Sequence, residues 1–254
     1  METTKPWDGN AIRKVLVLNG SPKRKASTTM VVTNAFLAGL NADNRLDVEV
    51  IDVSSLRIKP CTGCLHCWGQ SEGTCVIKDD DIPALKQKIL DADIIIQSYP
   101  LYFFSMPGEM KVMMDRLLSM MCTYEGQEAP KNGESFHGFR YPNPNQRLIV
   151  ISGCAYTEAA EVYRPLLAQY DCIFGKKHYT PIFVPQLRTL CDYPNERKRL
   201  RFLEKFTEAG RLFRQDGKLS EEEIALLWKP PFAPKTYQTL LNVFWTSERE
   251  KGRK

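Results

Sequence analysis

The sequence lacks the features that would send a chain into or across a membrane. No apolar run approaches the length of a membrane-spanning helix, and the opening segment METTKPWDGNAIRK has neither the apolar stretch nor the cleavage site of a secretory signal. Internal repeats and low-complexity tracts are absent as well. We therefore expect a globular cytoplasmic protein. Its eight cysteines should then be thiols, metal ligands or redox groups rather than structural disulfides.

Two common nucleotide-binding motifs are also missing. The turn after the first predicted strand lacks G-x-G-x-x-G, which argues against a Rossmann dinucleotide site, and the absence of G-x-x-x-x-G-K-[ST] excludes a P-loop. The net charge of +5 fits attraction to an acidic cofactor or substrate. That charge is far from the basic loading of a dedicated nucleic-acid binder.

The chain has enough apolar residues for a substantial core. Its 254 residues, 43% of them hydrophobic and 26% charged, allow one large domain with additions or two small domains. Short β-branched or aliphatic runs predict strands at 13–19, 46–52, 92–98, 147–152 and 179–184. Helical spacing predicts helices at 27–40, 82–90, 107–121, 158–170 and 195–213.

This alternation predicts an α/β fold with a doubly wound, five-stranded parallel sheet covered by helices on both faces. Such sheets bind ligands at the carboxyl ends of their strands, near the point where the strand order reverses. The segments that follow the strands are therefore the places to look for a site.

Three of those segments have suitable chemistry. Residues 19–29, NGSPKRKASTT, combine hydroxyls and cations at a helix start, which suits a phosphate monoester; the alternative is a hydroxyl-rich helix cap without a ligand. Residues 98–107, SYPLYFFSMP, offer flat apolar surface for a ring, although some of these aromatics could instead be core. Residues 152–156, SGCAY, contain a glycine that permits close backbone approach.

Together these segments resemble the flavodoxin-like NAD(P)H-dependent FMN reductase family. The second segment is similar to that family's P-x-Y-x-x-x-x-P loop followed by K-x-x-x-D-R, here Lys111 and Asp115-Arg116, and the resemblance covers roughly 15–184. It implies that an FMN phosphate is held by Ser21, Lys23, Ser27, Thr28 and Thr29. It implies flavin-ring contacts from Pro100, Leu101, Tyr102, Phe103, Ser152, Gly153 and Cys154.

A compact group of cysteines lies between the second strand and the next helix. Cys61, Cys64, Cys67 and Cys75 have the spacing C-x2-C-x2-C-x7-C, and four thiolates this close are what a [4Fe–4S] cluster requires. Zinc more often uses two separated C-x2-C pairs. The spacing resembles that of the iron–sulfur flavoproteins, relatives in the same superfamily. Free thiols or a redox pair are the alternatives.

We expect a flavodoxin-like FMN-binding domain at 1–215, with the cysteine-rich insert at 60–81 and a long loop at 122–146. The loop is either functional or a mobile surface segment. We expect residues 216–254 to form a helical, aromatic-rich C-terminal extension that packs on the domain or on a second subunit. We expect a homodimer or homotetramer.

The resemblance implies an oxidoreductase in which NAD(P)H reduces FMN and the flavin then reduces a quinone, a nitro or azo compound, free flavin or a protein. Hydride transfer to a flavin needs no protein acid or nucleophile, so we predict no catalytic side chain. The alternative is an iron–sulfur flavoprotein-type carrier that receives electrons from ferredoxin through the cysteine cluster. A non-redox FMN-binding regulator is a third reading.

Overall fold

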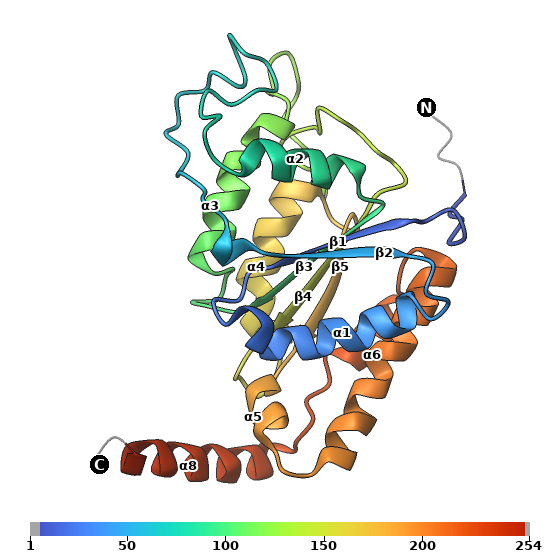
Figure 1. The fold of residues 1–254 in the computed structure, drawn as a ribbon, viewed down its shortest axis with the longest axis vertical. Coiled ribbons are helices and arrows are strands. Elements are labelled where there is room, and N and C mark those ends of the chain that lie inside the picture. Colours follow the sequence, from blue (N-terminus) through green and yellow to red (C-terminus); the bar gives the residue numbers. More distant parts are fainter. Residues whose placement is uncertain (1–5, 252–254) are drawn as a thin grey trace.

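A parallel sheet of five strands, in the order β2-β1-β3-β4-β5, runs through the computed structural model, which describes residues 6–251 (Figure 1). β1, β3 and β4 lie inside the sheet and are nearly completely buried, as parallel strands covered on both faces require. This confirms the predicted fold. The strands are β1 Lys14–Asn19, β2 Asp47–Asp52, β3 Ile94–Pro100, β4 Arg147–Gly153 and β5 Thr180–Val184.

Helices cover both faces of the sheet. One face carries α1 (Thr28–Leu40) and α6 (Glu196–Asp216); the other carries α2 (Ile82–Asp91), α3 (Gly108–Arg116) and α4 (Ala160–Phe174) (Figure 1). The helix predicted at 107–121 ends at Arg116 and continues as the 3-10 helix η3, Leu117–Met120. None of the helices within residues 6–251 is long and apolar enough to cross a bilayer.

Some short elements were not predicted, namely the 3-10 helices η1 (Arg24–Ala26) and η2 (Val53–Ser55) and the helix α5 (Leu187–Asp192). The C-terminal extension contains the helices α7 (Glu221–Leu227) and α8 (Pro234–Lys251), in agreement with the helical extension expected from the sequence. α7 begins with a capping box, in which Ser220 and Glu223 exchange side-chain and backbone hydrogen bonds. That S-x-x-E pattern was a signal the sequence offered.

The first part of the C-terminal extension packs on the domain. Trp228 stacks on Phe183 of β5 with ring centroids 5.1 Å apart, and its Nε1 donates to the carbonyl of Pro181 at 3.2 Å. Lys205 of α6 donates to carbonyls at the carboxyl end of α7, including that of Leu227. This packing explains why β5, although an edge strand, is almost fully buried.

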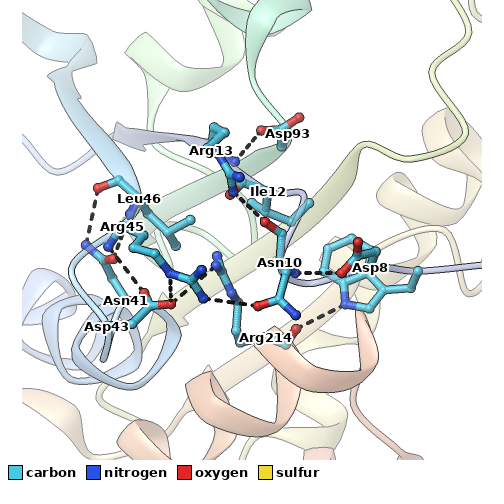
Figure 2. Close-up of polar contacts among 11 residues, drawn as sticks. Asp8, Asn10, Ile12, Arg13, Asn41, Asp43, Arg45, Leu46, Asp93 and Arg214 are labelled. Atoms are coloured by element: carbon cyan, nitrogen blue, oxygen red, sulfur yellow. Dashed lines mark hydrogen bonds and ion pairs between the residues drawn. The ribbon is translucent and has the colours of Figure 1, made fainter.

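A polar network closes the amino ends of β1 and β3 (Figure 2). The carboxylate of Asp93 accepts the backbone N–H of Arg13 at 2.8 Å, and Asp43 accepts a hydrogen bond from Arg45 at 2.6 Å. Arg214 of α6 lies 3.7 Å from the same Asp43 carboxylate. The loops with ligand-binding character lie at the opposite end of the strands.

Candidate functional site

The three predicted loops meet at the carboxyl ends of β1, β3 and β4. The N–H of Gly20 donates to the carbonyl of Ser98 at 2.9 Å, and the N–H of Leu101 donates to that of Gly153 at 2.9 Å. Each loop therefore starts as a continuation of the strand ladder. From β1 the chain passes to β2 on one side, and from β2 it crosses to β3 on the other side of β1. β1 and β3 therefore flank the switch point at which doubly wound sheets bind ligands.

The first turn presents hydrogen-bond donors at the start of α1. Ser27 is the N-cap and accepts the N–H of Met30 at 3.4 Å. Within residues 6–251, the N–H groups of Thr28 and Thr29 have no acceptor, so both can bind an anion at the positive end of the helix dipole. Thr28 is half-buried, whereas Lys23 is exposed.

Asn19, which the sequence prediction missed, holds this turn in place. Its fully buried amide donates to the carbonyl of Arg24 at 3.1 Å and to the carboxylate of Asp52 at 2.8 Å. Its Oδ1 accepts the N–H of Ser21 at 3.1 Å. The signal was an asparagine at the end of a strand, where its side chain can bond a following turn.

The turn also depends on a close approach at Gly20. A Cβ at this position would lie 2.1 Å from Cγ of Met110 and 3.1 Å from Cβ of Tyr99. The missing side chain lets the turn sit directly against β3 and α3. The phosphate turn and the second loop are thereby held close together.

The second loop is a tight hairpin that exposes aromatic rings. Tyr102 and Ser105 exchange two backbone hydrogen bonds of 2.9 Å, and the two turn residues Phe103 and Phe104 have φ angles of 46° and 63°. This left-handed pair normally requires Asn or Gly, so two phenylalanines there are strained. The reading of these aromatics as core is wrong, because Tyr102, Phe103 and Phe104 are 46%, 100% and 42% exposed.

The third loop has a buried base and an exposed tip. Ser152 and Gly153 are fully buried, and Cys154 is nearly so; burial raises the pKa of the Cys154 thiol. The hydroxyl of Ser152 accepts a hydrogen bond from Tyr163 of α4 at 3.2 Å, and Cys154 belongs to the core on that face of the sheet. The exposed tip carries Tyr156, which was not among the predicted contacts, and its ring centroid lies 5.6 Å from that of Phe104.

The residues present fit a ligand with a phosphate at one end and a flat ring at the other, as FMN has. The phosphate end has serine and threonine hydroxyls with the two free N–H groups of Thr28 and Thr29. The ring end has the exposed aromatic surfaces of Tyr102 and Tyr156, with Pro100 and Leu101 half-buried between the loops.

A buried ion pair anchors the cysteine-rich insert to α3. Arg116, the arginine of the K-x-x-x-D-R pattern, contacts Asp80 at 2.5 Å, and these two side chains are 0% and 1% exposed. Arg116 also donates to the carbonyls of Lys59 at 2.7 Å and Ile77 at 3.0 Å. The insert is thus fixed at both of its ends by one guanidinium group.

The four cysteines of the insert are not gathered into a metal-binding group. Cys61 and Cys64 are exposed, whereas Cys67 and Cys75 are half-buried. Across the part of the chain that the structure describes, no three His, Cys, Asp or Glu side chains are placed to hold a metal ion. The [4Fe–4S] cluster at these four cysteines stays a prediction.

The thiols of the insert differ in acidity. Hydrogen bonds from the backbone of His66 and from Thr62 lower the pKa of Cys64. Burial, together with the neighbouring cysteines, raises the pKa of Cys67. Cys64 is thus the more readily ionised of these two thiols.

The long loop at 122–146 is tied to the body. Phe136 donates its N–H to the carbonyl of Cys172 in α4 at 3.0 Å, and Met121 pairs with Phe139 in an antiparallel bridge. A cavity of about 1480 Å³ lies beneath it, lined by apolar residues of α3 and α4 such as Met114. The three ligand loops border this cavity only at Met106, so it does not form the candidate site itself.

Relatives of known sequence match less than half of the chain. Residues 13–134 match the family NADPH-dependent FMN reductase. An iron–sulfur flavoprotein of Methanocaldococcus jannaschii is 35% identical over 103 residues, which is 41% of this chain and 51% of that protein. One from Archaeoglobus fulgidus is 30% identical over 105 residues, 41% of this chain and 46% of that protein. The chain spans about half the length of the curated relatives it matches.

Solved structures share the fold over more of the chain. An FMN-dependent NADH-azoreductase of Bacillus anthracis, in complex with FMN, superposes with a TM-score of 0.57 at 16% identity, covering 80% of this chain and 100% of that one. An NAD(P)H:quinone oxidoreductase of Methanothermobacter marburgensis gives 0.55 at 19% identity, covering 79% and 96%. The sequence match over residues 13–134 makes this part of the chain similar to the NADPH-dependent FMN reductase family and to the iron–sulfur flavoproteins, as its loop motifs predicted.

Proposed function

We propose that this protein is an FMN-dependent oxidoreductase that takes reducing equivalents from NAD(P)H. The observation that carries the proposal is the start of α1, where the N–H groups of Thr28 and Thr29 have no acceptor within residues 6–251 and lie in a turn of buried hydroxyls. The FMN-bound azoreductase with the same fold supports this assignment.

The chain's own residues bind and orient, and bound FMN supplies the hydride and electron chemistry. The phosphate turn fixes one end of the ligand by directed hydrogen bonds from Ser21, Ser27, Thr28 and Thr29, with Lys23 adding positive charge. The loops after β3 and β4 leave the opposite edge open and lined with aromatic surface. An open edge of this kind gives an electron acceptor access.

The acceptor we propose is a quinone, a nitro or azo compound, free flavin or a protein partner. We also propose a cytoplasmic location and assembly into a homodimer or homotetramer. All eight cysteines are free thiols, which supports a reducing compartment.

The phosphate turn is tested by removing its hydroxyls. We expect Ser27→Ala combined with Thr29→Val to weaken FMN binding about a hundredfold, because two buried donors to the phosphate are lost. The measurement is FMN titration by fluorescence quenching. Thr207→Val in α6 serves as the control and should leave the affinity unchanged. An unchanged affinity in the double variant would show that this turn is not the anchor.

The redox assignment is tested separately. Anaerobic addition of NADH or NADPH to the FMN-loaded protein should bleach the flavin absorbance, and a subsequent quinone should restore it. If neither nucleotide bleaches bound flavin, the reductase assignment fails even where FMN binding holds.

The iron–sulfur flavoproteins among the relatives favour a second candidate, an electron carrier that uses the four cysteines as cluster ligands and ferredoxin as donor. Protein purified without air should then contain iron and sulfide. Cys64→Ser should remove both while leaving FMN in place, and Cys172→Ser, an exposed cysteine outside the insert, should remove neither. Bleaching by NAD(P)H in iron-free protein would exclude the carrier as the main role.

A further inference from the structure

The cavity beneath the long loop at 122–146 differs from the close-packed core around it. Its volume is about 1480 Å³, whereas the interiors of folded proteins have few voids larger than a water molecule. It lies on the face of the sheet that carries α2, α3 and α4, where Ile95 of β3 and Leu148 of β4 line it. A concave apolar space with a few polar groups is the usual form of a small-molecule site.

The wall of the cavity is built from methionines and aromatic rings. Four of the eight methionines line it, namely Met106, Met114, Met120 and Met121. Methionine side chains are flexible and polarisable, so they adapt to apolar molecules of different shapes. On the side of the long loop, Phe139 stacks on Phe174 of α4 with ring centroids 5.9 Å apart. Phe139 is still 41% exposed, so the loop closes the cavity incompletely.

The charged side chains of the lining lie at its margins. Lys111 and Asp115 form an ion pair of 2.5 Å with each other, and their side chains are 47% and 46% exposed. The other charged lining residues lie at or near the amino ends of β4 and β5, and they are Arg147, Lys177, Asp216 and Lys218. The middle of the cavity therefore suits a neutral molecule, because a charge there would lose its hydration without gaining a partner.

One buried polar side chain borders this apolar space without a good partner. Gln97 of β3 is 4% exposed, and its neighbours in the sheet are Leu18 of β1 and Val150 of β4. Its Oε1 accepts a hydrogen bond from the hydroxyl of Tyr170. Within residues 6–251, the only acceptor near its Nε2 is the sulfur of Met114, at 3.6 Å. A thioether is a weak acceptor, so a buried donor is left available to a ligand.

We propose that this cavity is a second binding site, separate from the flavin loops, for a neutral apolar molecule whose carbonyl group accepts a hydrogen bond from Nε2 of Gln97. The apolar body lies against the methionine and aromatic wall, and the carbonyl satisfies the buried amide. Water suits this space less well, because a buried water needs about two to four polar partners and the wall around Gln97 is aliphatic and aromatic. The proposal goes beyond the redox function, since the site needs no FMN.

Equilibrium dialysis against benzophenone and diphenylmethane, with saturating FMN present, tests the role of the carbonyl, because the two compounds share their phenyl rings and differ in that group. We expect benzophenone to bind about fivefold more tightly, as one added hydrogen bond allows. Gln97→Met should abolish the difference while both compounds still bind. Gln87→Met, the same change at an exposed position of α2, should preserve it. No binding, equal native affinities, or a difference that persists in Gln97→Met would overturn the proposal.

Photo-crosslinking locates the bound molecule, because excited benzophenone forms covalent bonds with nearby C–H groups and favours methionine. Irradiation of the native protein should label Met114, Met120 or Met121, as peptide mass spectrometry identifies, and an irradiated sample without benzophenone is the control. The same labels are expected with and without FMN, so a failure of FMN binding leaves this test intact. It also decides the location if circular dichroism shows that Gln97→Met does not fold. Labels confined to residues 98–107 and 152–156 would refute a second site.

Discussion

Asn19 shows how much of the candidate site depends on one side chain. Its amide bonds the turn at two points and bonds Asp52 of β2, so the turn and two strands share one buried group. Phosphate-binding turns need their donors held in position before the ligand arrives, since ordering them later reduces affinity. Asn19 provides that order through hydrogen bonds within the chain.

We therefore predict that Asn19→Ala weakens FMN binding about tenfold or more and lowers the unfolding free energy by about 1–3 kcal/mol, because buried partners lose their hydrogen bonds. Asn41→Ala is a matched control. Asn41 also bonds backbone groups with its side chain, those of Leu46, but at the far end of α1. It should lose stability and keep its FMN affinity; equal FMN affinity in the two variants would contradict the role of Asn19.

Arg116 plays a comparable part for the cysteine-rich insert. We predict that Arg116→Ala costs about 3–5 kcal/mol of unfolding free energy, because Asp80 is left as an uncompensated buried charge. Lys111→Ala on the same helix removes an exposed ion pair with Asp115 and should cost less than about 1 kcal/mol. Urea denaturation compares the two, and similar losses would argue against the buried pair as the anchor.

Among the elements, α1 and α6 make an unusually close crossing. A Cβ at Gly210 of α6 would lie 2.1 Å from the carbonyl oxygen of Phe36 in α1. Backbone cannot give way as a flexible side chain can, so the helices would have to separate. The core cluster that includes Phe36, Phe206 and Phe213 depends on the short distance between α1 and α6.

Gly210→Ala should accordingly lower the unfolding free energy by about 1–3 kcal/mol, although alanine is the better helix former. Gly108→Ala is the control, because a methyl group there meets no atom within 4 Å. Thermal unfolding followed by circular dichroism makes the comparison. A Gly210 variant as stable as the Gly108 variant would show that the crossing tolerates separation.

Most of the elements were predictable, and the exceptions have a common cause. The buried strands are local aliphatic runs, so their positions and order of appearance follow from the chain itself. The end of α3 at Arg116 does not follow from the local sequence. The guanidinium of Arg116 is held by partners at positions 59, 77 and 80, which lie far away along the chain. Contacts between distant segments leave no periodic signal.

For the whole molecule, the buried pair also links stability to pH. Burial alone would raise the pKa of Asp80, but hydrogen bonds from Arg116 and from the backbone of Lys59 and Ile82 outweigh it, and the pKa lies below its usual value. A carboxyl group whose pKa is lower in the folded state stabilises the protein above its unfolded-state pKa, about 4. That contribution is lost as the pH falls through the folded-state value.

The stability gap between the native protein and Asp80→Asn should therefore be constant from neutral pH down to about 5 and close progressively below about 4. Urea unfolding at a series of pH values measures it. The double variant, Arg116→Ala with Asp80→Asn, completes a double-mutant cycle that gives the interaction energy between these two side chains. A stability difference that grows as the pH falls would contradict a lowered pKa of Asp80 in the folded state.

The candidate site was predictable in its parts but not in its arrangement. Hydroxyls, cations and aromatics placed after successive parallel strands sufficed to find the phosphate turn and the hairpin at Tyr102, because the carboxyl ends of such strands meet at one edge. Whether Cys154 is buried, Phe103 exposed or Tyr156 part of the rim depends on how loops pack against one another. Sequence spacing does not encode that packing.

Local patterns along the chain were enough for the layered α/β architecture and for the motifs shared with the NADPH-dependent FMN reductase family, since both arise from short-range periodicity and from residues close together in sequence. Only folding in three dimensions settled the roles of Asn19 and Arg116, and the course of α8 away from the body. Each of these depends on groups tens of residues apart, whose interaction energies exist only once the core has brought them together.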